Sequence, residues 1–411
     1  MKGQVNTDNL FVALDIGTTK ICALVAQQVG DNGLNILGIG KSQSYGVSRG
    51  VVVDIAQAVA SIKLAIKEAE LMAGCKIDSV YVGVSGAHIQ SVSSSGIVPV
   101  KNGQIRESDI AAVLATAKAV VIPEGQQILH LLPKYYAIDG LQKVMDPVGM
   151  YGVRLEAEVH IITGSIASVQ NIINCCQLAG LRVIDVILEP LASAQAVLSK
   201  DEQELGVGLL DIGGGTSDFA VYQQGTIRHT KIFGVAGNHV THDIALCLRT
   251  TIKDAERIKR EHGHVGLLRD TVQQFQIELV HGAEHAVARD SDLLSIIEPR
   301  IEELVLMLSE EINQQHLHSY IQAGLVLTGG GSLLQGIKDI FQNTLTIPVR
   351  IGKPHVPTVY KESLESPVYA TSYGLLLHAL KSSRGSYMDQ LTGPLLTRIL
   401  WRMKSWVSDF F

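Results

Sequence analysis

The pattern of apolar and polar positions contains a weak internal duplication that predicts the architecture. Residues 11–41 and residues 207–233 each read as an apolar strand, a glycine turn, a second strand, a polar turn and a third strand. Both copies carry Leu-Asp-Ile-Gly where the first strand ends, at 14–17 and 210–213. The later turn holds Gly with Asn or Gln, which is typical of a β-hairpin. We therefore expect two similar halves.

Segments with helical spacing follow each copy. Residues 55–74 and 165–180 place apolar side chains at steps of three and four, so they predict helices. We expect Gly74 to close the first helix and Ser165 to cap the second. Strands that alternate with helices indicate an α/β fold. The same pattern predicts a buried strand at 183–190 and the start of a helix at 191–199. It also predicts a strand, glycine turn and helix at 325–336 and a last core helix at 371–380.

Two segments interrupt the repeats, and a third follows them. Residues 87–162 mix strand runs (89–100, 126–139 and 153–163) with one helix near 108–121, which we expect Ser108 to begin. Residues 243–320 have a mostly helical pattern and carry much of the charge. Residues 381–393 are polar and rich in turn formers, so they predict a linker.

Composition narrows the class of protein. The 411 residues exceed one ordinary core, and 46% apolar with 18% charged residues suit buried cores. The formal net charge of −6 argues against nucleic acid as the main partner, because duplex binders need a clustered positive surface. The five cysteines show neither metal-ligand spacing nor a disulfide pattern, so we interpret them as small apolar residues in a reducing cytosol.

Neither a signal peptide nor a membrane-spanning helix is expected. The first ten residues are polar and lack an apolar core, and the chain has no run of about 20 apolar residues. Any contact with a membrane is therefore expected at its cytoplasmic side.

Three glycine turns offer the chemistry of a phosphate site. Glycine lets backbone N–H groups approach a phosphate closely, and nearby hydroxyl and ammonium groups add hydrogen bonds. The two aspartates that end apolar strands, Asp15 and Asp211, are placed to hold waters of a bound Mg²⁺. The three turns consist of Asp15, Gly17, Thr18, Thr19 and Lys20; of Asp211, Gly213, Gly214, Gly215 and Thr216; and of Gly329, Gly330, Gly331 and Ser332.

One such turn alone is most often a hairpin with a convenient glycine. Two copies in matched contexts, with a third turn after another strand, favour a nucleotide site instead. The third turn fits neither the GxGxxG nor the GxxxxGK[ST] pattern, so the Rossmann and P-loop interpretations lose support.

The three turns resemble the phosphate 1, phosphate 2 and adenosine motifs of the actin, sugar-kinase and heat-shock-chaperone superfamily. This resemblance implies an actin-like ATPase fold with ATP and Mg²⁺ held in a cleft between two duplicated α/β domains. It places Gly237 and Asn238 beside the nucleotide, and Glu256 and Lys259 beside its ribose and base. An ordinary exposed i,i+3 ion pair is the alternative for Glu256 and Lys259.

Within this superfamily the chain is most similar to the bacterial FtsA cell-division family. The specific stretches are 146–155, 204–207, 237–241 and 297–300. The resemblance implies a division into subdomain 1A (1–86, 164–199 and about 366–380), inserted subdomain 1C (87–163), subdomain 2A (200–242 and 316–365), subdomain 2B (243–315), a linker (381–393) and a membrane-targeting helix (394–411).

Hydrolysis would need a residue that orients the attacking water. In actin-like ATPases a Gln or Glu near the first inter-domain connection orients the attacking water, and Glu189 falls near that place. A carboxylate that caps the helix from residue 191 is the alternative. The resemblance implies a slow ATPase at most, so we interpret ATP as a conformational and assembly switch.

The C-terminal segment predicts an amphipathic helix without any family knowledge. At about 100° per residue its apolar side chains share one arc of about 160°. Pro394 suits the first helical position, both tryptophans lie in this segment, and Trp401 alone breaks the pattern. Docking on the protein's own core is the alternative. The predicted membrane contacts are Leu395, Leu396, Ile399, Leu400, Arg402, Met403, Lys404, Trp406, Val407, Phe410 and Phe411.

The resemblance also implies partners. In this family the C-terminal tail of the tubulin-like FtsZ docks on subdomain 2B, and Arg300 matches a position important for that contact. The alternative is a solvated arginine at the start of a helix over 299–315, with Pro299 at its first position. Subdomain 1C is the implied site for later division proteins and for contacts within an actin-like filament.

These inferences predict an ATP-binding division protein that polymerises and tethers the FtsZ ring to the cytoplasmic face of the inner membrane at the division septum. A small-molecule kinase of the same superfamily would need an acidic base facing a substrate pocket and no membrane helix. A shape-determining filament usually carries its membrane element elsewhere, and a pilus-assembly adaptor lacks the terminal helix. A heat-shock chaperone needs a further β-domain, for which 381–411 leave no room.

Overall fold

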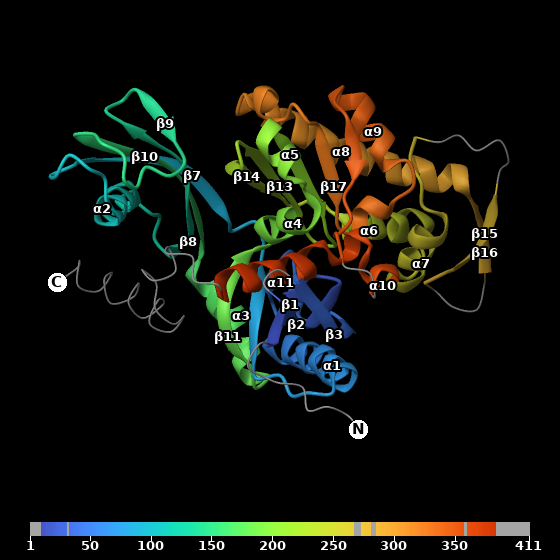
Figure 1. Cartoon of the computed structure of the whole chain (residues 1–411). Helices are drawn as coiled ribbons and strands as arrows, with labels where there is room; N and C mark the ends of the chain where they lie inside the picture. Colours follow the sequence, from blue (N-terminus) through green and yellow to red (C-terminus); the bar gives the residue numbers. More distant parts are fainter. Residues whose placement is uncertain (1–9, 31–32, 267–272, 281–284, 357–359, 384–411) are drawn as a thin grey trace.

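The computed structural model describes residues 10–30, 33–266, 273–280, 285–356 and 360–383. Within these residues, each predicted half is built on a mixed sheet, and helices lie on both faces of each sheet (Figure 1). The predicted duplication is therefore confirmed at the level of strands.

The two duplicated hairpins form equivalent parts of the two sheets. In the first sheet, ordered β11-β6-β1-β2-β3, the antiparallel strands are β1 (Leu10–Ile16), β2 (Lys20–Val29) and β3 (Gly33–Gln43), joined in parallel by β6 (Ser79–Val84) and β11 (Arg182–Leu188). The second sheet, ordered β14-β13-β12-β17-β18, repeats this with β12 (Val207–Ile212), β13 (Ser217–Gln223), β14 (Thr226–Phe233), β17 (Leu325–Thr328) and β18 (Val349–Ile351).

Two helices lie between the sheets and belong to one buried core with both. They are α4 (Glu189–Val197) and α11 (Ala370–Ser383), whose side chains pack with Leu24 of the first sheet and Leu209 of the second. A Cβ at Gly374 of α11 would overlap the carbonyl oxygen of Ala192, so this close helix contact requires glycine. The outer faces are covered by α1 (Ile55–Ala73) and α3 (Ile166–Leu178) on the first sheet, and by α6 (Gly237–Leu248), α8 (Asp290–Gln314) and α9 (Ile337–Leu345) on the second.

An inserted unit with its own core projects from the first half (Figure 1). Its sheet, ordered β7-β10-β8-β9, consists of β7 (Gln90–Pro99), β10 (Arg154–Ser165), β8 (Gln126–Ile138) and β9 (Gln142–Val144), packed against α2 (Glu107–Lys118). The insert also contacts the second half. Ser91 Oγ donates to the Thr230 carbonyl at 3.0 Å, and His160 Nε2 lies 3.0 Å from Thr230 Oγ1. The insert thus bridges both halves.

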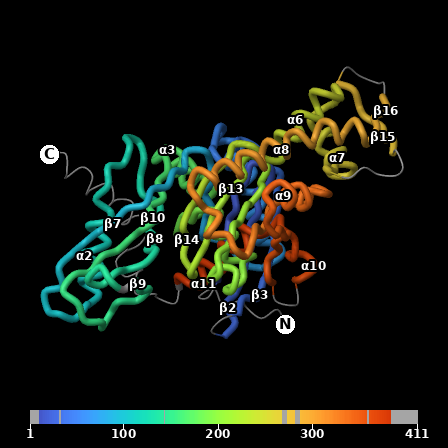
Figure 2. The backbone as a smooth tube through the Cα atoms, turned by 90° about the horizontal axis from the view of Figure 1, so that it is seen from above, coloured from blue at the N-terminus to red at the C-terminus, as the bar shows by residue number. Residues whose placement is uncertain are grey.

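A second projecting unit extends from the second half (Figure 2). It combines α6 and α8 with α7 (Ile252–His262) and a hairpin of β15 (Gln274–Glu278) and β16 (His285–Arg289). The sequence pattern predicted mostly helix here and missed this hairpin, in which Phe275 and Ile277 alternate with exposed polar residues.

The local predictions met different outcomes. Ser165 caps α3 and Gly74 closes α1 at φ 68°, as predicted. The prediction for Ser108 was wrong, because α2 begins at Glu107 and the Asp109 carboxylate accepts from the N–H of Arg106 at 2.8 Å. The third glycine turn leads into a single 3₁₀ turn, and α9 begins only later. The shorter elements are β4 (Val47–Ser48), β5 (Val51–Val52), α5 (Lys200–Leu205), α10 (Lys361–Leu364), and 3₁₀ turns η2 (Leu317–Tyr320), η3 (Gly330–Leu333) and η4 (Pro367–Tyr369).

Helix α11 continues through Ser383, so residues 381–383 are helical rather than part of a linker. The rest of the predicted linker, 384–393, and the predicted membrane helix, 394–411, lie outside the described residues. Among the helices of the described residues, none combines the length and the apolar character needed to span a bilayer.

Candidate functional site

The first two glycine turns, predicted from the duplication, contact each other where the two halves meet. A Cβ at Gly214 would overlap the hydroxyl of Thr19, and a Cβ at Gly215 would overlap that of Thr18. Each turn is closed by its own hydrogen bond, from Gly17 N to the Lys20 carbonyl at 3.1 Å and from Gly213 N to the Thr216 carbonyl at 2.9 Å. Bare backbone of one half therefore lies directly against hydroxyl groups of the other.

The two strand-end aspartates are buried and oriented by hydroxyl groups of the helices between the sheets. Asp15 accepts from Ser372 Oγ at 2.9 Å, and Lys20 Nζ lies 3.8 Å from its Oδ2. Asp211 accepts from Ser193 Oγ at 2.5 Å and from Thr371 Oγ1 at 3.2 Å. Burial, followed by repulsion from Asp15, raises the pKa of Asp211 even though these hydroxyls stabilise its charge.

Glu189 is the first residue of α4 and points toward this acidic group. Burial, then repulsion from Asp15 and Asp218, raises the pKa of Glu189 well above its ordinary value. The capping alternative is wrong, because α4 begins at Glu189 itself, after Leu188, and has no side-chain cap hydrogen bond. The water-orienting role stays a prediction.

The sequence interpretation missed Asp218. Its Oδ2 accepts from Ser85 Oγ at 2.6 Å. Ser85 follows β6 and leads into the insert, a segment called the stem of the insert below. Burial raises the pKa of Asp218 to about 7. A charged residue within the apolar strand β13, three residues after the second glycine turn, is the signal that would have identified it.

The predicted adenosine-side residues lie together at the other end of the second turn. Gly237 N donates to the Gly213 carbonyl at 3.1 Å, and Asn238 N to the Gly214 carbonyl at 2.8 Å. Lys259 Nζ lies 2.6 Å from Glu256 Oε2 and donates to the Gly237 carbonyl at 3.0 Å. The side chains of this ion pair are only 16% and 25% exposed, so it is not the ordinary surface pair of the alternative.

Charge and burial act differently on the two members of this pair. Burial lowers the pKa of Lys259, although Glu256 opposes the shift. Burial alone would raise the pKa of Glu256, but Lys259 together with hydrogen bonds from Thr241 and Arg260 outweighs burial, and the pKa falls.

The third glycine turn lies against Asp211. Gly329 has φ 79°, and a Cβ there would overlap the Asp211 carboxylate, so this position requires glycine. Ser332 Oγ donates to the Gly329 carbonyl at 2.7 Å, which uses the hydroxyl to hold the turn. Gly330 borders open space, with its nearest neighbour for a Cβ, Val368 Cγ2, 4.0 Å away.

The assembled residues fit a nucleotide with Mg²⁺. The second turn provides backbone that a Cβ would fill, the first provides hydroxyls and the Lys20 ammonium, and the acids lie at the junction. Among the described residues, no group of three or more His, Cys, Asp or Glu side chains has the spacing to hold a metal directly. The Mg²⁺ contact of Asp15 and Asp211 through water stays a prediction.

Arg300 lies away from these turns, in the middle of α8. Pro299 is inside this helix, which begins at Asp290, so the predicted helix start at residue 299 was wrong. Arg300 is also not simply solvated. Its Nε and Nη2 contact the two carboxylate oxygens of Asp243 at 2.7 and 3.1 Å, and it pairs with Glu303. These bonds raise the pKa of Arg300.

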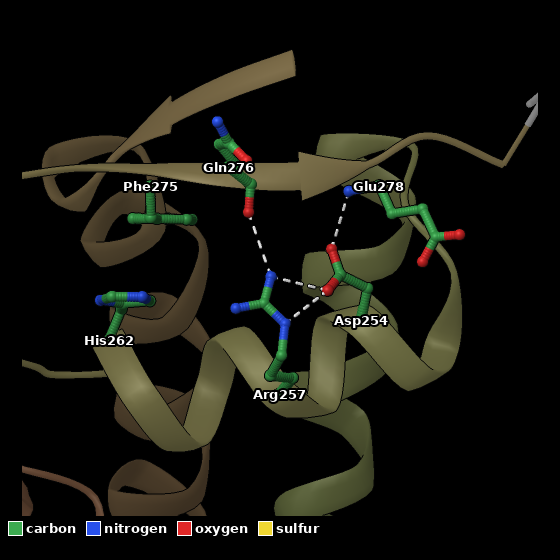
Figure 3. Close-up of a pocket in the computed structure, with 6 residues that line it drawn as sticks. All are labelled: Asp254, Arg257, His262, Phe275, Gln276 and Glu278. Carbon is green, nitrogen blue, oxygen red and sulfur yellow. Dashed lines mark hydrogen bonds and ion pairs between the residues drawn. The ribbon is translucent and has the colours of Figure 1, made fainter. Parts of the chain in front are cut away.

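A separate hollow lies between α7 and β15 (Figure 3). Arg257 on its wall pairs with Asp254 and donates to the Gln276 carbonyl at 3.1 Å, and His262 stacks on Phe275 with ring centroids 4.5 Å apart. Figure 3 shows these polar groups turned toward one another, so they fix the hairpin to the helix.

Comparison with known proteins places the chain in a family. The family described as "Cell division protein FtsA" matches residues 208–374, and "SHS2 domain inserted in FTSA" matches residues 86–163. The cell division protein FtsA of Pseudomonas aeruginosa is 40% identical, over 99% of this chain and 100% of that protein. The chain belongs to the FtsA family. The FtsA proteins of Neisseria meningitidis (38%, over 97% of this chain and 98% of that protein) and Escherichia coli (39%, over 91% of each chain) are similar as well.

Solved structures show the same fold at much lower identity. The "PilM-PilN type IV pilus biogenesis complex" matches with a TM-score of 0.66 at 18% identity, covering 90% of this chain and 98% of that one. MreB 5 of Spiroplasma citri, solved bound to AMPPNP, matches with a TM-score of 0.57 at 16% identity, covering 92% and 98%. The predicted actin-like α/β fold is confirmed, as is the resemblance to the FtsA family.

Proposed function

We propose that this FtsA-family chain binds ATP with Mg²⁺ between its halves, assembles in actin fashion and anchors FtsZ filaments to the cytoplasmic face of the inner membrane at the division septum. In this proposal it also helps to recruit later division proteins through the insert. The subdomain division given above is part of the proposal.

One observation carries the nucleotide part of the proposal, namely the contact of Gly214 and Gly215 with Thr19 and Thr18. Two phosphate-type turns that meet across the gap between halves suit a ligand gripped from both sides, because backbone N–H groups and hydroxyls bind phosphate oxygens. The related fold of MreB 5, solved with AMPPNP and with ADP, supports the choice of an adenine nucleotide.

The chain's own residues then have distinct roles. Lys20 and the turn amides bind phosphate oxygens, Glu256 and Lys259 border the ribose and base, and Glu189 orients water for slow hydrolysis. Hydrated Mg²⁺, when bound, neutralises phosphate charge beside Asp15 and Asp211.

The partner part of the proposal depends on family membership and on Arg300. We place the FtsZ tail on the unit formed by α6, α7, α8 and the β15–β16 hairpin. The Asp243 contacts hold the Arg300 guanidinium in one orientation while 28% of its side chain stays exposed, so it is available to a partner.

The membrane part depends on residues 394–411. A single amphipathic helix binds lipid modestly and reversibly. Filament formation would present many such helices at once and raise avidity without new contacts.

The test compares the full chain with a chain that ends at Gly393. We expect both to bind ATP in the presence of Mg²⁺, measured by isothermal calorimetry, and both to bind an FtsZ tail peptide. Only the full chain should pellet with anionic liposomes, more strongly when it is assembled. Failure of the full chain to bind ATP contradicts the nucleotide part, and equal pelleting of both chains contradicts the membrane part.

A paired substitution tests the partner surface. Arg300→Ala should weaken the tail peptide about tenfold, as expected for the loss of a charge-assisted contact, while leaving ATP affinity unchanged. Lys253→Ala, an exposed cation on α7 of the same unit, is the matched control and should leave peptide affinity within about twofold. Equal loss in both variants would show that the surface was disturbed rather than that Arg300 binds the tail.

A further inference from the structure

The short turn between β4 and β5 holds an arginine in a strained conformation. Arg49 has φ 49°, in the left-handed region that side chains other than glycine, asparagine and aspartate seldom occupy. Arg49 and Gly50, at φ 49° and 75°, are the two central residues of the β4–β5 hairpin, a turn that requires positive φ at both positions.

This turn contacts both phosphate-type turns. Gly50 N donates to Thr18 Oγ1 of the first turn at 3.3 Å. A Cβ on Gly215 of the second turn would lie 2.9 Å from the Cα of Arg49 and 3.0 Å from its nitrogen. Arg49 is thus placed where the two halves meet.

The opposite side of the turn is fixed to the stem of the insert. A Cβ at Gly50, where φ is 75°, would lie 2.6 Å from the Ser85 carbonyl oxygen, so close packing there requires glycine. Ser85 in turn donates to the buried Asp218. The backbone around Arg49 is therefore held from three directions while its side chain is exposed.

The two ends of the second turn have different neighbours, which indicates the end of a bound nucleotide that would lie beside Arg49. Gly213, at one end, accepts from Gly237 N, and the Gly237 carbonyl in turn accepts from Lys259 on the predicted adenosine side. Gly215, at the other end, meets Arg49. The guanidinium also lies within electrostatic reach of α6, because its charge, after burial, lowers the pKa of His239.

We propose that Arg49 binds the terminal phosphate of the bound nucleoside triphosphate and thereby makes the site prefer a triphosphate to a diphosphate. This inference rests on the proposed nucleotide site. The planar guanidinium forms two parallel hydrogen bonds to phosphate oxygens, which suits the end of the phosphate chain farthest from the adenosine side. No phosphate motif lies near Arg49 in the chain, so its place beside the two turns follows from the fold.

Two substitutions separate the side chain from the backbone. Arg49→Ala removes the guanidinium and keeps the backbone strain, whereas Arg49→Gly removes the guanidinium and relieves the strain, because glycine accepts positive φ. Ser48→Ala, on the same turn, is the matched control. Dissociation constants for ATP and for ADP, both with Mg²⁺, are measured by isothermal calorimetry, and circular dichroism checks folding.

We expect both Arg49 variants to bind ATP about ten- to a hundredfold more weakly and ADP within about twofold of the wild-type chain. Ser48→Ala should change neither constant. The proposal is overturned if Arg49→Gly leaves the ratio of the ATP and ADP dissociation constants unchanged, whether both affinities stay the same or fall equally. A wild-type chain that binds neither nucleotide contradicts the nucleotide site itself, which is a different result from a loss of preference.

Discussion

The two duplicated glycine turns share a backbone plan and differ in what they present. The first turn, around Thr18 and Thr19, offers hydroxyls and the Lys20 ammonium, and Lys20 reaches the Val368 carbonyl. The second turn, around Gly214 and Gly215, offers bare backbone, and its strand adds the buried Asp218. The two copies of the hairpin therefore differ in charge. The first turn carries the Lys20 ammonium, whereas the second turn presents uncharged backbone.

The aspartates that end the two strands show the same divergence. Asp15 has a cation 3.8 Å away, whereas the contacts described for Asp211 are hydroxyls of Ser193 and Thr371. Neighbouring residues of α11, Thr371 and Ser372, serve Asp211 and Asp15 respectively. One helix therefore sets the positions of both carboxylates, and the halves differ mainly in how they balance buried charge.

The largest effect is expected at these acids. Asp211→Asn and Asp15→Asn should each lower Mg²⁺-dependent ATP affinity about a hundredfold, measured by isothermal calorimetry. Without nucleotide, Asp211→Asn should raise the melting temperature, because burial disfavours its charge. Asp15→Asn should not raise it, because the substitution removes the partner of Lys20. A rise of equal size in both variants would show that the acids are balanced alike.

An intermediate effect is expected from a methyl group added to the second glycine turn. Gly214→Ala should weaken ATP binding about tenfold, because the new Cβ overlaps the Thr19 hydroxyl. Thr19→Ala in the same chain should restore part of the loss, and a double-mutant cycle by calorimetry measures the coupling. Strict additivity would mean that the two turns do not meet in solution.

The smallest effect is a pH dependence of stability at Asp218 in the second half. The pKa of Asp218 is raised to about 7, above its ordinary value of 3.8, so the folded chain holds more protons between these pH values. Its stabilising contribution is therefore complete at low pH and is lost as pH rises through about 7. Asp218→Asn should raise the melting temperature by about 3 °C at pH 8 and much less at pH 5, by scanning calorimetry. An equal rise at both pH values would contradict the raised pKa.

Features encoded in local patterns could be predicted from the sequence, and features that depend on distant contacts could not. Leu-Asp-Ile-Gly followed by a hairpin turn identified the first and second glycine turns, because strand, glycine and turn are adjacent in the chain. Pro299 misled the prediction of α8, because proline usually marks a helix start and is here inside the helix.

The missed residues have a common cause. Asp218 stands out in the sequence as a charged residue of an apolar strand, but its partner Ser85 is far away in the chain, as Gly215 is from Arg49. Glu256 and Lys259 were predicted from the family resemblance, but their burial against Gly237 depends on how α6 and α7 pack. Burial and cross-half contacts are properties of the folded chain that a single sequence does not display.

The contact of the insert with Thr230 has a mechanical consequence. The insert continues from the first half through β6 and returns to it at α3, yet Ser91 and His160 fasten it to β14 of the second half. A swing that widens the gap between the halves must either break these fastenings or tilt the whole insert. If the insert tilts, its far edge around β9 moves farther than the contact at Thr230 does, because it lies farther from the two halves (Figure 1). A small rotation between the halves would therefore give a larger displacement at β9.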